Sequence, residues 1–428
     1  MTTGAGYSVV IPTVGRASLA VLLDSIAASA VATGLPLPAG VLVADRREPA
    51  ADLVIARRAA WPITVLRSGG RGPAAARNTG WRACDSEWVA FLDDDVLVSP
   101  RWLRDLERDL AAAAGTVGGS QGRIEVPLPV YRRPTDLERG TATLVDAAWI
   151  TADLAYRRVA LLDCAGFDER FPRAFREDSD LALRMLDRGW QLVRGSRRTV
   201  HPVRPAGWWA SVGRQRGNAD DVLMRRRHGR NWRQRAAAPL GRRPQHLLST
   251  AAGLAALAAA VTGRRRLAAL TGACWAANTA EFSWRRIGPG PRDGAEVLRM
   301  ISTSVLLPPA ASWFWLRAVL SRTPDRPAAR PAAVLLDRDG TLVRDVAYNG
   351  DPALVSPMPG ARRALDRLRA EGIPIAVISN QSGIGRGLLS TDQVAAVNAR
   401  IESLLGPFDG WFVCPHTGEA GCDCRKPA

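Results

Sequence analysis

The chain has 428 residues, of which 47% are hydrophobic and 23% charged, and it carries a formal net charge of +17. This length is too great for one hydrophobic core, so two or three domains are expected. Three of the six cysteines stand alone and no secretory signal opens the sequence, which disfavours a secreted, disulfide-bonded protein and favours a reducing cytoplasm.

Strands and helices are expected to alternate over the first hundred residues. Apolar runs predict strands at 7–11, 41–44, 63–66 and 88–92, with Pro12 ending the first of them. Helices are expected at 17–30 and from Pro73 to about Cys84, after a glycine-rich turn at 69–72. This alternation predicts an α/β fold with a mostly parallel sheet, whose ligands bind at the carboxyl ends of the strands.

Three consecutive aspartates, Asp93, Asp94 and Asp95, follow the apolar run at 88–92. Carboxylates gathered at a strand end repel one another unless a cation neutralises them, which favours a divalent metal site. An acidic cap before the helix that follows Ser99 is the alternative. His201 is a further candidate ligand, and a packed histidine at a strand end explains it equally well.

These aspartates belong to a wider pattern that resembles the family 2 glycosyltransferases of the GT-A fold over roughly residues 5–235. The pattern consists of VVIPT at 9–13, RNTG at 77–80, FLDDD at 91–95, GFDERF at 166–171 and EDSDLALR at 177–184. The resemblance implies that a sugar passes from a nucleotide-sugar donor to a glycan or lipid-linked acceptor, with inversion.

The same resemblance implies a role for each matching residue. Asp45 would contact the base of the donor, while Arg77 and Asp93 would contact the rest of the nucleotide. Asp95, with His201 beside it, would bind a Mg²⁺ or Mn²⁺ ion that neutralises the departing diphosphate, and Asp178 would deprotonate the acceptor hydroxyl. The sequence departs from the family at 43–46, VADR, where paired acidic residues are usual.

The segment at 236–322 is expected to be helical and basic. Apolar runs cover 246–261, 267–280 and 301–320, the last interrupted by Pro308 and Pro309, and each is at or below the length that spans a bilayer. A two-span hairpin would place Arg264 to Arg266 on the outer side, against the positive-inside rule. Helices lying on the cytoplasmic leaflet are therefore favoured, with an ordinary helical domain as the alternative.

Most of the positive charge lies near these helices. Residues 201–300 contain 18 arginines and five acidic residues, a net charge of +13. An anionic membrane surface and nucleic acid both attract such a segment, but no nucleic-acid recognition motif accompanies it. The expected location is therefore cytoplasmic and peripheral to the inner face of the cell membrane. A Pro/Arg-rich linker at 323–331 precedes the last domain, 332–428.

The run VLLDRDGTLV at 334–343 predicts a buried strand that ends in Asp337 and Asp339. Two carboxylates in this spacing suit phosphoryl transfer, because one attacks phosphorus while the other handles the proton of the leaving oxygen. A second strand, at 375–379, ends in Ser379 and Asn380, whose hydroxyl and amide groups can hold phosphate oxygens. The helices that alternate with these strands again indicate an α/β fold.

A cluster of soft ligands closes the sequence. Cys414, His416, Cys422 and Cys424 lie within eleven residues and suit one tetrahedral zinc ion, with a disulfide or a chance cluster as the alternatives. Arg425 and Lys426 follow directly. Lys426 is the only lysine among the 58 basic residues, as expected where a compact point charge must neutralise a phosphate and a nucleophile.

The C-terminal motifs resemble the haloacid dehalogenase superfamily, in its histidinol-phosphatase and heptose-bisphosphate phosphatase branch, over roughly the last 95 residues. The resemblance implies that Asp337 is the nucleophile, that Asp339 is the general acid and base, and that both face a Mg²⁺ ion. It also implies that Ser379, Asn380, Arg425 and Lys426 bind the sugar phosphate, while the cysteines and His416 hold a structural zinc. The family has a further magnesium-binding aspartate on a later strand, so a C-terminally truncated phosphatase domain is expected.

Together these patterns predict a bifunctional sugar enzyme, a glycosyltransferase joined to a sugar-phosphate phosphatase. Two rival hypotheses stay open. In the first, only one half is active and the other is degenerate or regulatory. In the second, which is less favoured, the chain is a basic nucleic-acid-binding protein, whose duplex binding would weaken steeply with salt.

Overall fold

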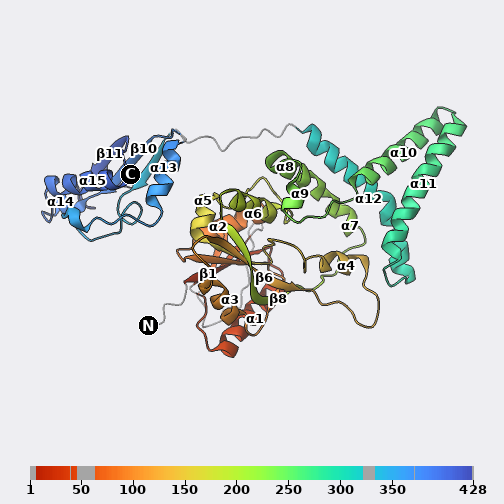
Figure 1. The fold of residues 1–428 in the computed structure, drawn as a ribbon, viewed down its shortest axis with the longest axis horizontal. Coiled ribbons are helices and arrows are strands. Elements are labelled where there is room, and N and C mark those ends of the chain that lie inside the picture. The colour runs from red at the N-terminus through yellow and green to blue at the C-terminus, as the bar shows by residue number, and fades with distance from the viewer. Residues whose placement is uncertain (1–5, 39, 46–62, 322–332, 371, 427–428) are drawn as a thin grey trace. The chain divides into compact units, whose positions relative to one another are not determined.

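The computed structural model describes residues 6–38, 40–45, 63–321, 333–370 and 372–426 (Figure 1). The chain forms two compact units, Met1–Thr323 and Pro324–Ala428. The linker expected at 323–331 lies outside the described residues, so each unit is considered by itself.

An eight-stranded sheet forms the core of the first unit, in the order β3-β2-β1-β4-β7-β6-β8-β5. Its strands are β1 (Tyr7–Thr13), β2 (Val41–Asp45), β3 (Ile63–Arg67), β4 (Trp88–Leu92), β5 (Leu97–Val98), β6 (Val117–Glu125), β7 (Asp153–Arg157) and β8 (Gln191–Val200). The first four strands pair in parallel, as expected. The sheet is nevertheless mixed, because β7 runs antiparallel to both β4 and β6, and β5 runs antiparallel to β8.

The first strand does not end at Pro12, as the sequence predicted, but continues to Thr13. The backbone N–H of Val9 donates to the carbonyl of Gly40, on the β2 side. Because successive N–H groups of a strand point in opposite directions, the nitrogen of Pro12 faces the β4 side. Pairing with β4 ends at Val10, so the proline removes no ladder hydrogen bond there.

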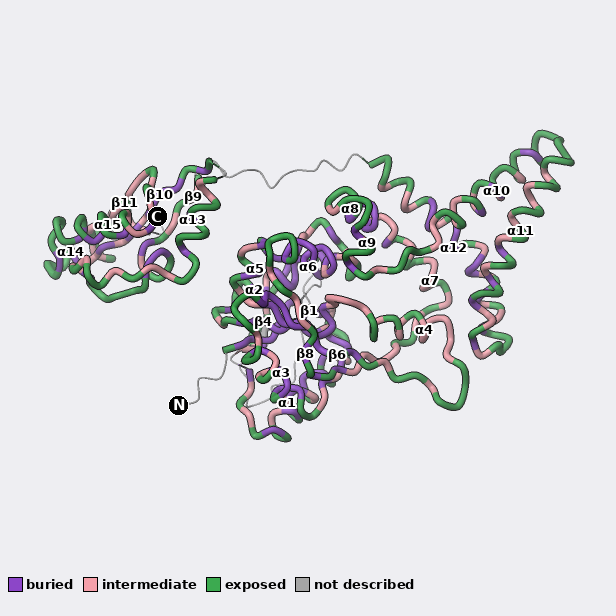
Figure 2. Tube along the Cα trace, in the orientation of Figure 1, coloured by how far each residue is buried: buried purple, intermediate pink, exposed green. Residues whose placement is uncertain are grey.

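Helices cover both faces of this sheet (Figure 1). On one face, α1 (Ser18–Thr33) and α3 (Trp102–Ala111) pack with Val9 and Ile11 of β1. On the other face, α2 (Pro73–Arg82), α5 (Arg158–Asp163) and α6 (Glu177–Asp187) pack with Val10 of β1. The alternation of side chains along a strand therefore gives the sheet two hydrophobic layers, visible as the buried segments in Figure 2.

One buried ion network holds β8 to the sheet. Arg197 is fully buried, and its Nε donates to Asp153 Oδ1 at 2.7 Å. Asp153 is also fully buried and accepts further hydrogen bonds from Trp102 Nε1 at 2.7 Å and Thr199 Oγ1 at 2.6 Å. Nη2 of Arg197 donates to the carbonyl of Ser120 at 2.6 Å. Nη1 donates to Asp109 and to the hydroxyl of Ser120, so each of the three guanidinium nitrogens has an acceptor.

Replacing Arg197 with methionine is expected to destabilise the first unit by about 3–5 kcal/mol, because Asp153 would remain buried without its cation. Urea unfolding followed by tryptophan fluorescence measures the change. The matched control is Arg198→Met, since Arg198 is the neighbouring residue of the same strand and pairs with Glu125 at the surface. Its loss is expected to cost less than about 1 kcal/mol, and equal effects of the two substitutions would contradict the prediction.

Short helices and a helical layer complete the first unit. The short helices are α4 (Asp136–Ala142), α7 (Ala210–Gly213), η1 (Arg214–Gly217), α8 (Asn218–His228) and α9 (Trp232–Arg235). The helical layer consists of α10 (Arg243–Val261), α11 (Arg265–Ile287) and α12 (Gly294–Leu320). Helices α10 and α11 form a hairpin that packs on α12, and α12 in turn packs on α7, η1 and α8.

The two prolines of α12 do not break the helix, contrary to the sequence-based expectation. Leu307, Pro308 and Ala311 are buried by the surrounding helices. Tertiary packing of this face therefore outweighs the two backbone hydrogen bonds that the prolines remove. Among the described helices, α10 alone is long and apolar enough to cross a membrane by length and composition.

The second unit has three parallel strands in the order β11-β10-β9. These are β9 (Val334–Asp337), β10 (Ile375–Asn380) and β11 (Gly410–Cys414), and they alternate with η2 (Pro352–Leu354), α13 (Ala361–Ala370), α14 (Ser382–Gly385) and α15 (Thr391–Leu405). Helix α15 begins after a Ser390 cap, and its buried face includes Val394, Val397 and Ile401. On α13, Ala361 and Leu365 are buried.

Candidate active sites

The three aspartates after β4 have different surroundings. Asp94 is buried, and its carboxylate accepts hydrogen bonds from Thr13 Oγ1 and Arg16 Nη1, both at 2.7 Å. These contacts fix the loop after β4 to the end of β1. Asp94 is therefore a positioning residue, while its neighbours Asp93 and Asp95 are left to face the site.

Asp93, Asp95 and His201 form the first candidate metal centre. One ligand atom from each residue lies within 4.8 Å of the others. The pKa of Asp95 is raised, first by burial and then by the charge of Asp93, while His201 and Arg204 oppose the shift. Arg204 Nε lies 2.6 Å from Asp95 Oδ2, an ion pair without hydrogen-bond geometry. Two carboxylates and an imidazole, one carboxylate oxygen lacking a hydrogen bond, fit a divalent cation such as Mn²⁺ or Mg²⁺.

Arg77 lies between two carboxylates, a placement that the sequence did not reveal. Its Nη2 donates to Asp93 at 2.9 Å, and its Nη1 donates to Glu177 at 2.7 Å. Only 2% of the Arg77 side chain is exposed. Arg77 therefore positions Asp93, in addition to its predicted contact with the nucleotide-sugar donor. Glu177 was not predicted, although its position next to Asp178 at the start of α6 was a signal.

Asp178 lies in the first turn of α6, where its Oδ1 accepts from the backbone N–H of Ser179 at 2.7 Å. Desolvation raises the pKa of Asp178, and the nearby Arg77 guanidinium lowers it. A carboxylate with a raised pKa beside a metal-ligand cluster suits a general base. Asp45 ends β2, in register with Thr13, but its side chain lies outside the described part of the structure.

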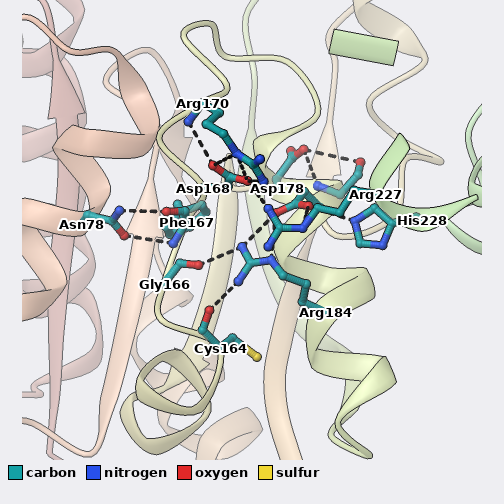
Figure 3. A network of polar contacts seen from close by, with 12 residues as sticks. Asn78, Cys164, Gly166, Phe167, Asp168, Arg170, Asp178, Arg184, Arg227 and His228 are labelled. Carbon is teal, nitrogen blue, oxygen red and sulfur yellow. Dashed lines mark hydrogen bonds and ion pairs between the residues drawn. The ribbon is translucent and has the colours of Figure 1, made fainter. Parts of the chain in front are cut away.

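A polar network holds α6 and the turn before it in place (Figure 3). The amide of Asn78 exchanges hydrogen bonds with the backbone of Phe167, at 2.9 Å in both directions. Arg184 donates to Asp180 and to the carbonyl of Gly166, both at 2.8 Å. His228, from α8, lies 2.8 Å from the second oxygen of Asp180.

This network explains why the GFDER and EDSDLALR motifs occur together. Asp180 is fully buried and joins α6 to α8, while Asn78 joins α2 to the turn at 166–168. These contacts hold the first turn of α6, which carries Asp178, in place.

Glu177 is expected to make the first unit lose stability as the pH rises from about 5 to 8. Burial, together with the charge of Asp178, raises the pKa of Glu177 to about 8, above its ordinary value of 4.5. The folded state therefore binds a proton that the unfolded chain has released, and this contribution is lost as the pH passes the folded pKa. Glu177→Gln keeps a hydrogen-bonding partner for Arg77 but does not titrate.

Urea unfolding at pH 5 and at pH 8, with a chelator present, tests this expectation. The parent chain should lose roughly 3 kcal/mol more over this interval than Glu177→Gln does. Glu169→Gln is a suitable control, because that carboxylate is partly exposed and pairs with Arg71 at the surface. Parallel pH profiles for the parent chain and Glu177→Gln would contradict the assignment of the proton to Glu177.

The second candidate site lies at the carboxyl ends of β9 and β10. Asp337 ends β9, and its Oδ1 lies 2.6 Å from Nζ of Lys426. Lys426 Nζ also donates to the carbonyl of Ile378 in β10 at 3.1 Å. The only lysine of the chain is thus held directly beside the predicted nucleophile.

Asp339 is oriented by Gln381 and Arg338, a role that the sequence did not reveal for either residue. Gln381 Nε2 donates to Asp339 at 2.9 Å and to Ser379 Oγ at 2.7 Å. Arg338, which is 2% exposed, donates its Nε to Asp339 at 3.0 Å. Gly340, with φ of +73°, allows the chain to turn between the strand and the following loop.

Asn380 and Arg425 have protein partners. The side chain of Asn380 exchanges two hydrogen bonds with the backbone of Lys426, each at 3.1 Å. Arg425 Nη1 donates to the carbonyl of His416 at 3.0 Å. Both residues therefore tie the Cys/His loop to the site and place Lys426. Their predicted contact with phosphate stays a prediction.

The four soft ligands converge as their spacing predicted. Sγ of Cys414 lies 3.7 Å from that of Cys422 and 3.6 Å from that of Cys424, and Nδ1 of His416 lies 3.3 Å from Cys424 Sγ. Separations of this size match the edges of a tetrahedron around one zinc ion. All four ligand atoms lie within 4.8 Å of one another, and the cysteines are free thiols. The donor set therefore fits a structural zinc.

Each unit thus places carboxylates at the carboxyl ends of parallel strands, the arrangement of an α/β protein with two separate chemical sites. Comparison with known proteins assigns a family to each. The family model described as "Glycosyl transferase family 2" matches residues 8–166. The D-glycero-alpha-D-manno-heptose-1,7-bisphosphate 7-phosphatase of Mycobacterium tuberculosis H37Rv is 39% identical over 100 residues, which are 22% of this chain and 53% of the relative.

A probable heptose-bisphosphate phosphatase of Thermoplasma volcanium is 34% identical over 98 residues, covering 22% of this chain and 67% of the relative. The chain therefore belongs, in its C-terminal region, to the haloacid dehalogenase superfamily in the heptose-bisphosphate phosphatase branch, and its residues 8–166 match glycosyltransferase family 2. It spans about half the length of the first of these curated phosphatases.

Two solved structures are similar as well. A D,D-heptose 1,7-bisphosphate phosphatase from B. bronchiseptica, complexed with magnesium and phosphate, is 33% identical and covers 23% of this chain and 57% of its own, with a TM-score of 0.22. The mannosyltransferase PcManGT from Pyrobaculum calidifontis, in complex with GDP-Man and Mn²⁺, is 18% identical and covers 74% of this chain and 88% of its own, with a TM-score of 0.44.

Proposed function

We propose that the chain is a bifunctional sugar enzyme, with inverting transfer from a nucleotide sugar at the first site and hydrolysis of a heptose bisphosphate-like sugar phosphate at the second. The observation that carries the proposal is the pairing of catalytic groups within each unit. The first unit brings Asp93, Asp95 and His201 together, and the second holds Lys426 Nζ 2.6 Å from Asp337. The family that matches each unit supports the reaction proposed for that unit.

At the first site, Asp93, Asp95 and His201 would hold Mn²⁺ or Mg²⁺, which neutralises the charge that develops on the diphosphate. Arg204, which pairs with Asp95, would supply a second positive charge for the diphosphate. Asp178 removes the proton of the acceptor hydroxyl as that oxygen attacks the anomeric carbon. The network around Asp180 keeps this base in position, which matters because displacement of about 1 Å can cost a hundredfold in rate.

At the second site, the carboxylate of Asp337 attacks phosphorus and forms an aspartyl phosphate, while Asp339 protonates the departing sugar oxygen. Asp339 then accepts a proton from the water that hydrolyses the aspartyl phosphate. Lys426 and Ser379 hold the phosphate oxygens, and Gln381 keeps Asp339 and Ser379 together. Asp337 and Asp339 would also hold Mg²⁺, which lowers the charge repulsion between nucleophile and phosphate.

Cys414, His416, Cys422 and Cys424 would hold zinc as a structural ion, which orders the loop that carries Lys426. Elemental analysis of the purified chain should find about one zinc per molecule, and Cys422→Ser together with Cys424→Ser should remove it. The metal content of Cys84→Ser, which changes a buried cysteine of the first unit, should be unchanged.

The two activities can be separated by one experiment on the full chain. Asp95→Ala should abolish metal-dependent release of the nucleoside diphosphate but leave phosphate release from heptose 1,7-bisphosphate intact. A donor screen supplies the nucleotide sugar for this assay. If Asp95→Ala keeps its transfer rate, the proposed metal centre is wrong, and if one activity is absent from the parent chain, that half is degenerate or regulatory.

We also propose that the chain lies in the cytoplasm, bound peripherally to the inner face of the membrane. The net charge of +13 over residues 201–300 and the exposed apolar helices support it. Binding to anionic vesicles at low salt, reversed by high salt, is the expected result. A chain that stays in the supernatant at low salt would refute the proposed location but not the two activities.

A further inference from the structure

An apolar pocket opens among α10, α11 and α12 of the first unit, and none of the residues that line it belongs to a candidate active site. Its volume is about 540 Å³, within the range of ligand pockets. All three helices contribute to it: Ser249, Thr250, Gly253, Leu254, Ala256, Leu257 and Ala260 from α10, Ala268 and Trp275 from α11, and Val305, Leu306 and Pro309 from α12. None of these side chains carries a charge, so the pocket suits an aliphatic group.

The rim of the pocket is unusually apolar for a surface that faces water. Leu254 and Leu257 are 63% and 66% exposed, and Leu306, on the neighbouring helix, is 44% exposed. Figure 2 shows α10 and α11 with little buried surface along their length. An exposed apolar patch continuous with a pocket marks an interaction site.

Two polar features mark the ends of the pocket. At the hairpin tip, Arg264, Arg265 and Arg266 are all exposed, and among the described residues no acidic partner is recorded for them. They lie within about one helical turn of Ala260 and Ala268, the pocket residues nearest the tip. At the other end, Ser249 is only 3% exposed, and its Oγ lacks a hydrogen-bond partner within the described structure.

These charges determine how the hairpin can meet a bilayer. A spanning hairpin would carry three arginines through the hydrocarbon, at a cost of at least about 2.5 kcal/mol for each. A hairpin that lies in the interface keeps the arginines among the headgroup phosphates while its leucines enter the acyl region. From Ser249 to Ala260 the pocket extends about 17 Å along α10, so in an interfacial hairpin an acyl chain that fills the pocket lies along the helix, in the plane of the membrane.

We propose that the pocket binds one acyl chain of an anionic phospholipid, whose phosphate is held by Arg264, Arg265 and Arg266. The inference rests on the proposed membrane location and specifies its ligand. The hidden hydroxyl of Ser249 can donate to an ester oxygen of a neighbouring lipid. A partner protein helix could also fill an apolar groove, but it would not account for three adjacent unpaired cations beside the pocket.

Trp275 supplies a probe, because it lines the pocket. The full chain is mixed with phosphatidylglycerol vesicles whose acyl chains are brominated, and the quenching of tryptophan fluorescence is measured. Trp275→Phe should remove a measurable part of the quenching. Trp284→Phe is the matched control, because Trp284 lies on the same helix, is 65% exposed and does not line the pocket. Equal quenching of the parent chain and Trp275→Phe overturns the pocket assignment.

Two further variants separate a filled pocket from a general disturbance of the helix. Ala260→Phe fills the pocket from an exposed position, whereas Ala258→Phe adds the same ring at an exposed position of α10 outside the pocket. We expect Ala260→Phe to weaken vesicle binding at least threefold and Ala258→Phe to leave it unchanged. Equal binding by both variants would mean that the hairpin meets the membrane without an acyl chain in the pocket.

The headgroup is tested by replacing Arg264, Arg265 and Arg266 with glutamine, against a control that replaces the exposed Arg123, Arg230 and Arg317. Both variants lose three charges, so general attraction to the membrane falls equally. The tip variant should lose its preference for phosphatidylglycerol over phosphatidylcholine, and the control should keep it. An identical response of the two overturns the phosphate site. Absence of all vesicle binding would instead refute the membrane location itself.

Discussion

Asp337→Asn is expected to lower phosphate release from heptose 1,7-bisphosphate by at least about a thousandfold, because the amide cannot attack phosphorus. Asp337 ends β9 beside Lys426, and no other carboxylate of the described structure is recorded as an ion-pair partner of that lysine. Sugar transfer at the first site should be unchanged. Steady-state release of phosphate, measured with the full chain and added Mg²⁺, gives the result.

The control for this variant is Asp345→Asn, which removes an exposed carboxylate from the same unit. It should retain full activity and the same zinc content as the parent chain. Substrate binding offers a second readout, because Asp337→Asn removes a negative charge facing the phosphate and should bind it at least as tightly. Activity of Asp337→Asn within tenfold of the parent chain would mean that another group is the nucleophile.

The sequence predicted those features that depend on local chemistry. The strand ends at 92 and 337 were found, and that at 380 to within one residue, because apolar runs stop at polar residues, and parallel strands bring such ends to one edge of a sheet. The Cys/His ligands converge because they are close in sequence, so a single local loop suffices. The family resemblances were confirmed for the same reason, since motifs are short and contiguous.

Features that depend on distant packing were missed. The sequence did not distinguish Asp94 from its neighbours, because only the approach of Thr13 and Arg16 from another strand gives it a structural role. It likewise predicted breaks at Pro12 and Pro308. Whether a proline ends a strand depends on the neighbouring strand at that position, and whether it ends a helix depends on how that face of the helix packs. A local sequence pattern contains neither.

Asp178→Asn is expected to lower sugar transfer by about a hundredfold to ten-thousandfold while donor affinity stays within about threefold. Asparagine keeps the shape of the side chain and can still accept from the N–H of Ser179, so α6 should be unperturbed. Binding of the nucleotide sugar, measured by calorimetry, separates this result from general damage. Asp187→Asn, at the exposed far end of the same helix, should retain full transfer activity.

The pH profile adds a readout that a merely structural role would not affect. Because desolvation raises the pKa of Asp178, transfer by the parent chain should increase with pH above the range of an ordinary aspartate, as the base loses its proton. The residual activity of Asp178→Asn should lack this rise. Strong loss of donor binding in the variant would instead place Asp178 among the donor contacts. Together with the fixed position of α6, a lost pH dependence at unchanged donor affinity is what a general base requires and a positioning residue does not produce.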